Sequence, residues 1–305
     1  MLKPKKNVII TFLGPALLFY IMIFLYPTLR TVVMTFFAVE SVSDPSSKWA
    51  FNGFANYIKA FTGIPLFIQS LFNILRIWFF GGLGVMFLAL LFSTILTQDK
   101  FKGMKFFRAV IYLPNLVSAV AMAGMWLTYI YHAEFGLLTG LIRLVSRETL
   151  ESIQWTGPGT RFWALLVGYC FGMVGYHMLI FISGIEQIPQ DYHDAAVIDG
   201  ANALQRFAFI TIPFIRGVTR TNIVMWTVFV VGFFVWGHLF SPISPSNDTA
   251  GPLNVLYHTV FGTTAGANIV RDAGTGAVMG VSMMVMVIVV FFASSFIVKK
   301  DDVEI

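Results

Sequence analysis

A polar stretch, DYHDAAVIDG at residues 191–200, lies between two long apolar segments of the chain. Asp191 and Asp194 place negative charge in the first turn of a helix, where the positive end of the helix dipole favours it. Gly200 can adopt a backbone conformation that other residues resist, and Pro213 cannot continue a helix. The sequence therefore predicts a short helix, a turn at Gly200 and a second short helix that Pro213 closes.

The spacing of small and apolar residues in this stretch carries a family resemblance. The pattern has two alanines, three residues, a glycine, nine residues and then Ile-x-x-Pro, which here are Ala195, Ala196, Gly200, Ile210 and Pro213. It resembles the cytoplasmic loop signature of permease subunits of ATP-binding-cassette (ABC) importers, and Asp199 before the glycine resembles the carbohydrate branch. Asp194 stands where the family usually has Glu, and Ile212 stands where it has Leu. Both replacements keep the charge or the hydrophobic character.

The composition indicates an integral membrane protein. Hydrophobic residues make up 57% of the chain and charged residues 11%, and the mean hydropathy is +0.78. The single cysteine, Cys170, lies in an apolar run, so we expect neither a disulfide framework nor a metal site, and no cofactor. The net charge of +5 is spread along the chain, which indicates membrane topology rather than nucleic-acid binding.

Six apolar segments are long enough, or nearly so, to cross a bilayer as helices. We place them at about 8–36, 71–96, 107–131, 162–185, 217–240 and 277–298. The first resembles a signal peptide, but its apolar run is too long and we expect it to be retained. The predicted fold is therefore all-α: one transmembrane domain over 1–305, with six spans and a cytoplasmic coupling loop at 186–216.

The distribution of basic residues predicts the orientation of these spans. With the N-terminus inside, twelve basic residues fall on the inner side: Lys3, Lys5, Lys6, Lys100, Lys102, Lys105, Arg108, Arg206, Arg216, Arg220, Lys299 and Lys300. Six fall on the outer side: Lys48, Lys59, Arg143, Arg147, Arg161 and Arg271. Both termini and the loop at 186–216 are thus predicted to be cytoplasmic, in a bacterial-type cell membrane.

Glycines inside the apolar segments indicate close helix packing. Two pairs are spaced four residues apart, and a cluster occurs in the second segment: Gly168 and Gly172, Gly276 and Gly280, and Gly81, Gly82 and Gly84. Small residues at such spacing let helices approach each other closely. The cluster lies within an apolar span, so it predicts packing or bending and not a phosphate cradle.

Enzymatic function finds no support in the sequence. The chain has no Gly-x4-Gly-Lys-Ser/Thr motif, so we expect that it does not bind nucleotide by that route. The family resemblance implies that the ATPase site belongs to a partner subunit. The five histidines have no metal-ligand spacing. A lone histidine inside an apolar segment, such as His177 in the fourth segment, is more often a hydrogen-bonded structural residue than a functional one. His177 stays a candidate for the solute pathway, because a polar side chain at membrane depth tends to face the bundle interior or a cavity.

Aromatic residues of the fifth segment form a second pathway candidate. Trp226, Phe229, Phe233 and Trp236 recur at spacings of three, four and three, which places them on one helical face. Aromatic rings stack on the apolar faces of sugars, so this stripe could line a carbohydrate path. Helix packing or lipid contact would explain the stripe equally well.

The resemblance implies the partners and the mechanism. Cytoplasmic ATPase subunits would receive the short helix in a groove, a second homologous permease would complete the path, and an extracytoplasmic solute-binding protein would deliver a sugar. ATP-driven closure would then rock the helices between inward-facing and outward-facing states. The alternative is an ion-coupled secondary transporter, but the sequence shows neither a mid-membrane ionisable pair nor a convincing internal repeat.

Overall fold

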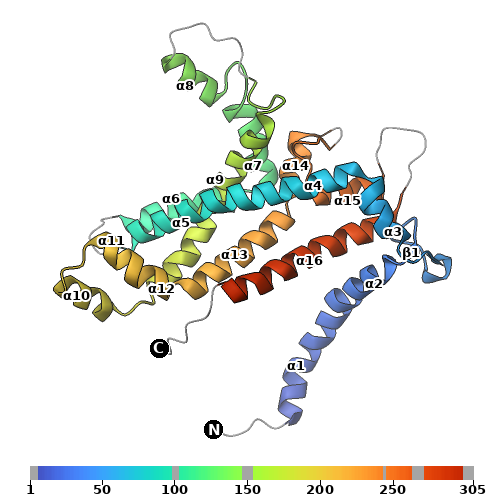
Figure 1. Cartoon of the computed structure of the whole chain (residues 1–305), viewed down its shortest axis with the longest axis horizontal. Coiled ribbons are helices and arrows are strands. Elements are labelled where there is room, and N and C mark those ends of the chain that lie inside the picture. Colours follow the sequence, from blue (N-terminus) through green and yellow to red (C-terminus); the bar gives the residue numbers. More distant parts are fainter. Residues whose placement is uncertain (1–5, 98–102, 146–153, 243–244, 263–270, 298–305) are drawn as a thin grey trace. The chain divides into compact units, whose positions relative to one another are not determined.

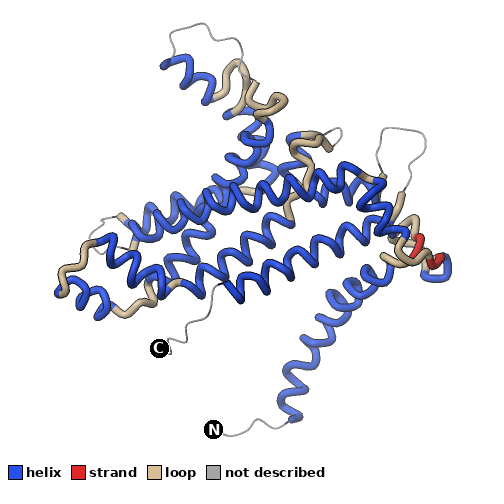
Figure 2. Tube along the Cα trace, viewed as in Figure 1, coloured by secondary structure: helices blue, strands red, loops and turns tan. Residues whose placement is uncertain are grey.

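A computed structural model describes residues 6–97, 103–145, 154–242, 245–262 and 271–297. The described chain is almost entirely helical, with one two-stranded antiparallel sheet (Figures 1 and 2). This confirms the predicted all-α class. The chain divides into two compact units, Met1–Ile68 with Val255–Val285, and Gln69–Asn254 with Met286–Ile305.

The first unit combines the N-terminal part of the chain with a segment near its C-terminal end. Its elements are α1 (Lys6–Tyr20), the π turn η1 (Ile21–Leu25), α2 (Tyr26–Met34), β1 (Phe37–Ala38), the 3-10 turn η2 (Ser46–Lys48), β2 (Ala50–Phe51), α3 (Ala55–Ile58), the π turn η3 (Lys59–Gly63), the start of α4 (Pro65–Arg76), most of α15 (Pro252–Phe261) and the first half of α16 (Ala273–Ile297). Residue 298, where the last span is expected to end, lies outside the described residues.

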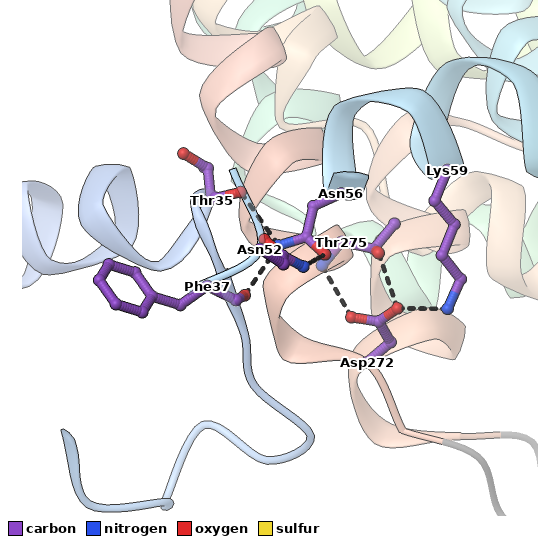
Figure 3. Close-up of polar contacts among 7 residues, drawn as sticks. All are labelled: Thr35, Phe37, Asn52, Asn56, Lys59, Asp272 and Thr275. Carbon is purple, nitrogen blue, oxygen red and sulfur yellow. Dashed lines mark hydrogen bonds and ion pairs between the residues drawn. The ribbon is translucent and has the colours of Figure 1, made fainter. Parts of the chain in front are cut away.

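A polar junction ties three of these elements together (Figure 3). The Asn56 side chain is buried, and its Nδ2 donates to the carbonyls of Thr35 at 3.0 Å and Phe37 at 2.8 Å. Asn52 Nδ2 in turn donates to Asn56 Oδ1 at 3.0 Å. Asn56 therefore joins α3 to the end of α2 and satisfies carbonyls that the helix end leaves unpaired.

The second half of the junction caps α16 (Figure 3). The Asp272 carboxylate accepts three hydrogen bonds: from the backbone N–H of Thr275 at 2.8 Å, from the Thr275 hydroxyl at 2.7 Å and from the Lys59 ammonium at 2.6 Å. Burial raises the pKa of the Asp272 carboxyl, but these hydrogen bonds outweigh it and hold the pKa below its usual value. A negative charge thus stays at the positive end of the α16 dipole.

The second unit contains the main core. Its elements are the rest of α4, the π turn η4 (Ile77–Gly81), α5 (Gly82–Leu96), α6 (Met104–Leu116), α7 (Ala119–Met125), the π turn η5 (Trp126–Ile130), α8 (Leu137–Val145), α9 (Arg161–Ile185), α10 (Gln190–Ile198), α11 (Ala203–Arg206), the π turn η6 (Phe207–Thr211), α12 (Ile212–Phe214), α13 (Arg216–Val231), α14 (Val235–Phe240) and the end of α16.

Helix α9 is the centre of this unit. It packs mainly against α5 and α6, and most of its central window is buried (Figure 1). A side chain at Gly175 would collide with the backbone of α6 at Ile111 and Tyr112, so only glycine permits this approach. Close to it, Asn115 Nδ2 donates to the Gly172 carbonyl at 3.2 Å.

Two tryptophans lock α13 against the helix formed by α4, η4 and α5. Trp226 Nε1 donates to the Trp78 carbonyl at 2.9 Å, and Trp78 Nε1 donates to the Thr227 hydroxyl at 2.8 Å. The Trp226 ring lies directly over Gly81 and Gly82, where a Cβ atom would come within 2.9 Å and 2.7 Å of it. Within the glycine cluster, Gly81 and Gly82 therefore leave the space that one indole ring occupies.

Four continuous helical segments are long and apolar enough to cross a membrane: Ile10–Met34, Pro65–Leu96, Arg161–Ile185 and Ala273–Phe296. Two bent pairs, Met104–Leu116 with Ala119–Ile130 and Ala203–Phe214 with Arg216–Val231, bend by 96° and 69°. Among the described residues, the count of spans reaches the predicted six if each bent pair is one span.

Two expected helices are interrupted, and local chemistry explains the first of these breaks. In the segment expected at 107–131, Pro114 lacks an N–H, Val117 is extended, and the Ser118 side chain caps α7 by accepting from the Ala121 N–H. The segment expected at 217–240 ends as α13 at Val231, and α14 follows after three residues.

The tryptophan lock predicts that Gly82→Leu is destabilising, because the new side chain would displace the Trp226 ring. We expect a loss of about 1–3 kcal/mol, as for overpacked cores. Thermal unfolding of the detergent-solubilised chain measures it. Gly84→Leu is the matched control, since a Cβ atom at Gly84 meets nothing within 4 Å; equal loss of stability in the two variants would contradict the lock.

Candidate functional site

The stretch around residue 200 forms the predicted helix and turn. Helix α10 follows Pro189 and ends with Asp199 as its C-cap. Gly200 has a φ of +80°, which favours glycine. The Gly200 N–H donates to the Val197 carbonyl at 3.0 Å and the Ala201 N–H donates to the Ala196 carbonyl at 2.8 Å. This is a Schellman motif, which satisfies the last carbonyls of α10 and sets the direction of the chain after it.

A capping box begins the second helix immediately after the turn. Asn202 Oδ1 accepts from the Gln205 N–H at 2.9 Å, and Gln205 Oε1 accepts from the Asn202 N–H at 2.8 Å. The helix then runs without interruption from Ala203 through the π turn to Phe214, before the bend into α13. The loop geometry is thus fixed by its own backbone and caps.

Two contacts fasten α10 to the core of its unit. The Tyr192 ring packs edge-on against Phe214 of α12, with ring centroids 4.9 Å apart. Ile188, just before α10, is buried in the same hydrophobic cluster as Ile215. Helix α10 therefore moves only together with the ends of the helices on either side of it.

The predicted coupling residues fall into two groups. Four are exposed, namely Asp194, Ala195, Asp199 and Gly200, and three are half-buried, namely Ala196, Ile210 and Pro213. Three large apolar side chains of this loop, which the sequence analysis did not single out, are also highly exposed. Ile198, Leu204 and Phe209 have 86%, 75% and 78% of their surface accessible. Their presence in a polar loop is the signal that could have identified them.

An ion pair stands at the root of the loop. Arg108 of α6 pairs through Nη1 with Glu186 Oε1 at 2.7 Å, and its Nη2 donates to the Leu96 carbonyl at 2.7 Å. Glu186 is the C-cap of α9, and Leu96 ends α5. One guanidinium therefore connects the ends of α5 and α9 to α6, where positive charge is favourable.

The aromatic stripe is divided by the structure. Trp226, Phe233 and Trp236 are buried and surround Tyr169, with ring centroids 5.7, 5.0 and 6.1 Å from it. Trp236 lies on α14, beyond the break after Val231, so the expectation of one continuous helical face does not hold. Burial of these three rings favours the packing interpretation for them.

Phe229 and Tyr176 lie apart from that buried group. Phe229 is half-buried, and its ring packs edge-on against Tyr176 with centroids 5.0 Å apart. Tyr176 lines an open pocket of about 300 Å³ between α6 and α9, whose lining residues are Tyr112, Tyr176, Leu179, Ile180 and Ser183. The pocket combines aromatic faces with three hydroxyl groups.

His177 is fully buried beside this pocket. Its Nδ1 lies 2.7 Å from Asn222 Oδ1, and Asn222 is fully buried as well. The sequence reading missed Asn222, although an asparagine inside an apolar segment is a signal for such a pair. Within the described ranges, no three His, Cys, Asp or Glu side chains gather as metal ligands would.

The chain was compared with known proteins by sequence and by structure. No protein-family model matches the chain. The arabinooligosaccharide transport system permease AraP of Halalkalibacterium halodurans is 25% identical over 303 residues, which cover 98% of this chain and 90% of AraP. The diacetylchitobiose uptake system permease NgcF of Streptomyces coelicolor is 25% identical over 301 residues, or 95% of this chain and 82% of NgcF.

The chain is a homologue of ABC-transporter permease subunits. The relatives are transport subunits and not ATPases. The fold of this permease matches a crystal structure of a bacterial ABC transporter for alginate import, with a TM-score of 0.75, 18% identity and coverage of 97% of this chain and 96% of the other. A second structure, of a bacterial alginate transporter with its pentasaccharide-bound periplasmic protein, gives a TM-score of 0.71 at 19% identity over 96% and 94%.

Proposed function

We propose that this permease imports an oligosaccharide or a related sugar by alternating access, and that ATPase subunits dock on the loop at 186–216 to drive it. The observation that carries the proposal is the exposed helix α10, held by a Schellman motif and a capping box in a chain that resembles sugar permeases over nearly its whole length. A rigid, exposed helix at the end of two membrane helices is suited to receive a mechanical push.

The loop surface supports docking of a protein partner. Ile198, Leu204 and Phe209 are exposed, and their burial by a partner would be favourable by the usual hydrophobic gain. Ala195, with its small side chain, and Gly200, with none, are exposed as well, so a groove of a partner can come close to the backbone there. Asp194 and Asp199 add exposed negative charge to the loop.

The pocket supports passage of a sugar. Sugar rings offer apolar C–H faces to aromatic rings and hydroxyl groups to hydrogen-bonding side chains. Tyr176 and the adjoining Phe229 supply the first kind of contact, and the hydroxyls of Tyr112 and Ser183 supply the second. We therefore assign the solute path to Phe229 rather than to Trp226, Phe233 and Trp236, which pack inside the core. His177 adjoins the path but is buried.

Further subunits complete the transporter in this proposal. The known alginate importer contains a periplasmic protein that presents a pentasaccharide. By analogy, an extracytoplasmic binding protein delivers the sugar to this permease, and a second homologous permease supplies the other half of the path. The ATPase is a separate subunit on the cytoplasmic side.

An ion-coupled mechanism fits the structure less well. Among the described residues, Lys59 pairs with Asp272 just before α16, and Arg108 pairs with Glu186 at the end of α9, so neither of these ion pairs lies in the middle of a span. A secondary transporter needs ionisable groups near the middle of the membrane to bind its coupling ion. ATP-driven transport is therefore the reading that we retain.

The docking proposal predicts that Gly200→Pro releases the ATPase. Proline fixes φ near −65° and removes the N–H that donates to Val197, so the turn cannot form. We expect the native chain to co-purify with an ATPase and a second permease from detergent-solubilised membranes, and the variant to lose the ATPase.

Gly200→Asn is the matched control for this experiment. Asparagine tolerates the left-handed conformation, so it preserves the turn and should retain the ATPase. Retention of the ATPase by the proline variant at native levels, or purification of the native chain alone with transport activity, would refute the proposal.

The path assignment predicts that Phe229→Ala lowers sugar uptake. Loss of a ring that contacts the solute should reduce the rate roughly tenfold, equal to about 1.4 kcal/mol. Uptake of a labelled arabino-oligosaccharide or diacetylchitobiose by proteoliposomes of the complete transporter measures it, with membrane abundance checked in parallel. Phe87→Ala is the control, because it removes an aromatic side chain that has 64% of its surface exposed and does not line the pocket. Equal uptake by all three chains would exclude Phe229 from the path.

The basic residues predict that both termini are cytoplasmic. Some of the residues that set this orientation, Lys3, Lys5, Lys100, Lys102, Arg147, Lys299 and Lys300, lie outside the described residues. A reporter that is active only in the cytoplasm, fused after Ile305, should be active in the complete chain. Activity of a reporter that requires export, fused at the same place, would reverse the topology.

A further inference from the structure

Two membrane helices carry the coupling loop. Helix α9 leads into it and ends at Ile185, and α13 leads out of it and begins at Arg216. A displacement of α10 enters the membrane through these two helices, because Ile188 and Tyr192 fasten α10 to their inner ends. The contacts between α9 and α13 therefore determine how a displacement of α10 is transmitted along these helices.

The two helices are joined at three depths. Near the loop, a side chain at Gly184 would collide with Val218, so the backbones are close. At the far end, Tyr169 packs on Trp226 with centroids 5.7 Å apart. Between them is the hydrogen bond between His177 and Asn222, at 2.7 Å and with both side chains fully buried. A hydrogen bond in such an environment resists separation strongly.

This hydrogen bond uses only part of what the two side chains offer. Asn222 Oδ1 can only accept, so the proton between the two atoms is on His177 Nδ1. His177 Nε2 is then an acceptor and the Asn222 amide nitrogen a donor, and neither has a partner among the described residues. Buried polar groups are normally satisfied. A pair with a spare donor and a spare acceptor can exchange its hydrogen bond when one helix slides along the other, which contacts between hydrocarbon groups cannot do.

The pair adjoins the proposed solute path. Tyr176, which lines the pocket, directly precedes His177 on α9. Phe229 lies seven residues after Asn222 on α13, hence on the same helical face. The His177 ring centroid is 5.8 Å from that of Trp226 and 6.4 Å from that of Phe229. A shift of α9 against α13 at this pair changes how Tyr176 faces Phe229.

We infer that the hydrogen bond between His177 and Asn222 is the joint that transmits movement of the coupling loop to the wall of the sugar path, with His177 and Asn222 as positioning residues that do not touch the solute. The inference rests on the proposed function. It replaces the expectation that His177 itself lines the path.

A cysteine reporter on the pocket wall tests the joint. The chain has one cysteine, so Cys170→Ser gives a cysteine-free chain to which Ile180→Cys, at a lining residue with no assigned contact to the sugar, is added as the reporter. The reporter chain is assembled with its ATPase and second permease in proteoliposomes. The rate of its reaction with a water-soluble maleimide is measured without nucleotide and after trapping with ATP and vanadate, alongside ATP hydrolysis.

We expect trapping to change the labelling rate of the reporter chain about tenfold. Asn222→Leu and His177→Phe should abolish that change while the complex still assembles and hydrolyses ATP. The reciprocal exchange, His177→Asn with Asn222→His, restores one hydrogen bond between the helices and should restore most of the change. If the pair only stabilised the fold, its loss would lower assembly and ATP hydrolysis together with the labelling change. Loss of the labelling change while ATP hydrolysis continues therefore distinguishes a coupling role from a structural one.

Other outcomes overturn the inference. If both single variants keep the full nucleotide-dependent change, the joint lies elsewhere and the proposed function stands. If they lose assembly and hydrolysis and the exchange does not restore them, the pair is structural. If the native pair shows no nucleotide-dependent change although the ATPase is bound and active, the inference and the coupling mechanism fall together.

Discussion

The indole ring of Trp226 is the contact on which the core of the larger unit depends. In a bilayer, apolar side chains gain little by leaving lipid for protein, so small residues and interhelical hydrogen bonds decide which helices associate. Gly81 and Gly82 leave room for the ring, and the carbonyl of Trp78 accepts its N–H. The π turn at Ile77–Gly81 lies in the helix at this point, and such turns often occur at functional positions. The ring also lies near the rings of Tyr169 and His177 of α9, with centroids 5.7 and 5.8 Å away, so one side chain is in contact with three helices.

This lock separates a firm region from regions that can bend. Around Trp226 the helices are close, aromatic and hydrogen-bonded. The chain is interrupted elsewhere, at Val117 and Ser118, at Ile215, and at 232–234, where helices bend or end. Changes of shape during transport are therefore expected at these interruptions, while the tryptophan lock keeps α13 in register with the helix formed by α4, η4 and α5.

Local chemistry made part of the structure predictable. The turn at Gly200 follows from its conformational freedom, and the helix at Arg161–Ile185 lies where a long apolar run was expected at 162–185. The sequence did not predict in the same way which residues or solutes contact each helix face. Periodicity placed Trp226, Phe233 and Trp236 together, but nothing in it says whether a solute or Tyr169 covers them. The role of Asn222 was not predicted, because its partner His177 is forty-five residues away in the sequence. The end of α6 at Leu116 was not predicted either, because it depends on the combined effect of Pro114, Val117 and Ser118.

The exposed apolar side chains of the coupling loop have a consequence for how the cell handles this subunit. On the proposed docking of an ATPase at this loop, Ile198, Leu204 and Phe209 would face water in a chain that has not met that subunit. Exposed apolar residues on a short helix are the kind of surface that chaperones and membrane proteases select, and a surface of this kind also promotes aggregation. If an ATPase docks on this loop as proposed, synthesis of the chain without that partner would shorten its lifetime, and the amount of the ATPase would set how much of the chain the membrane retains.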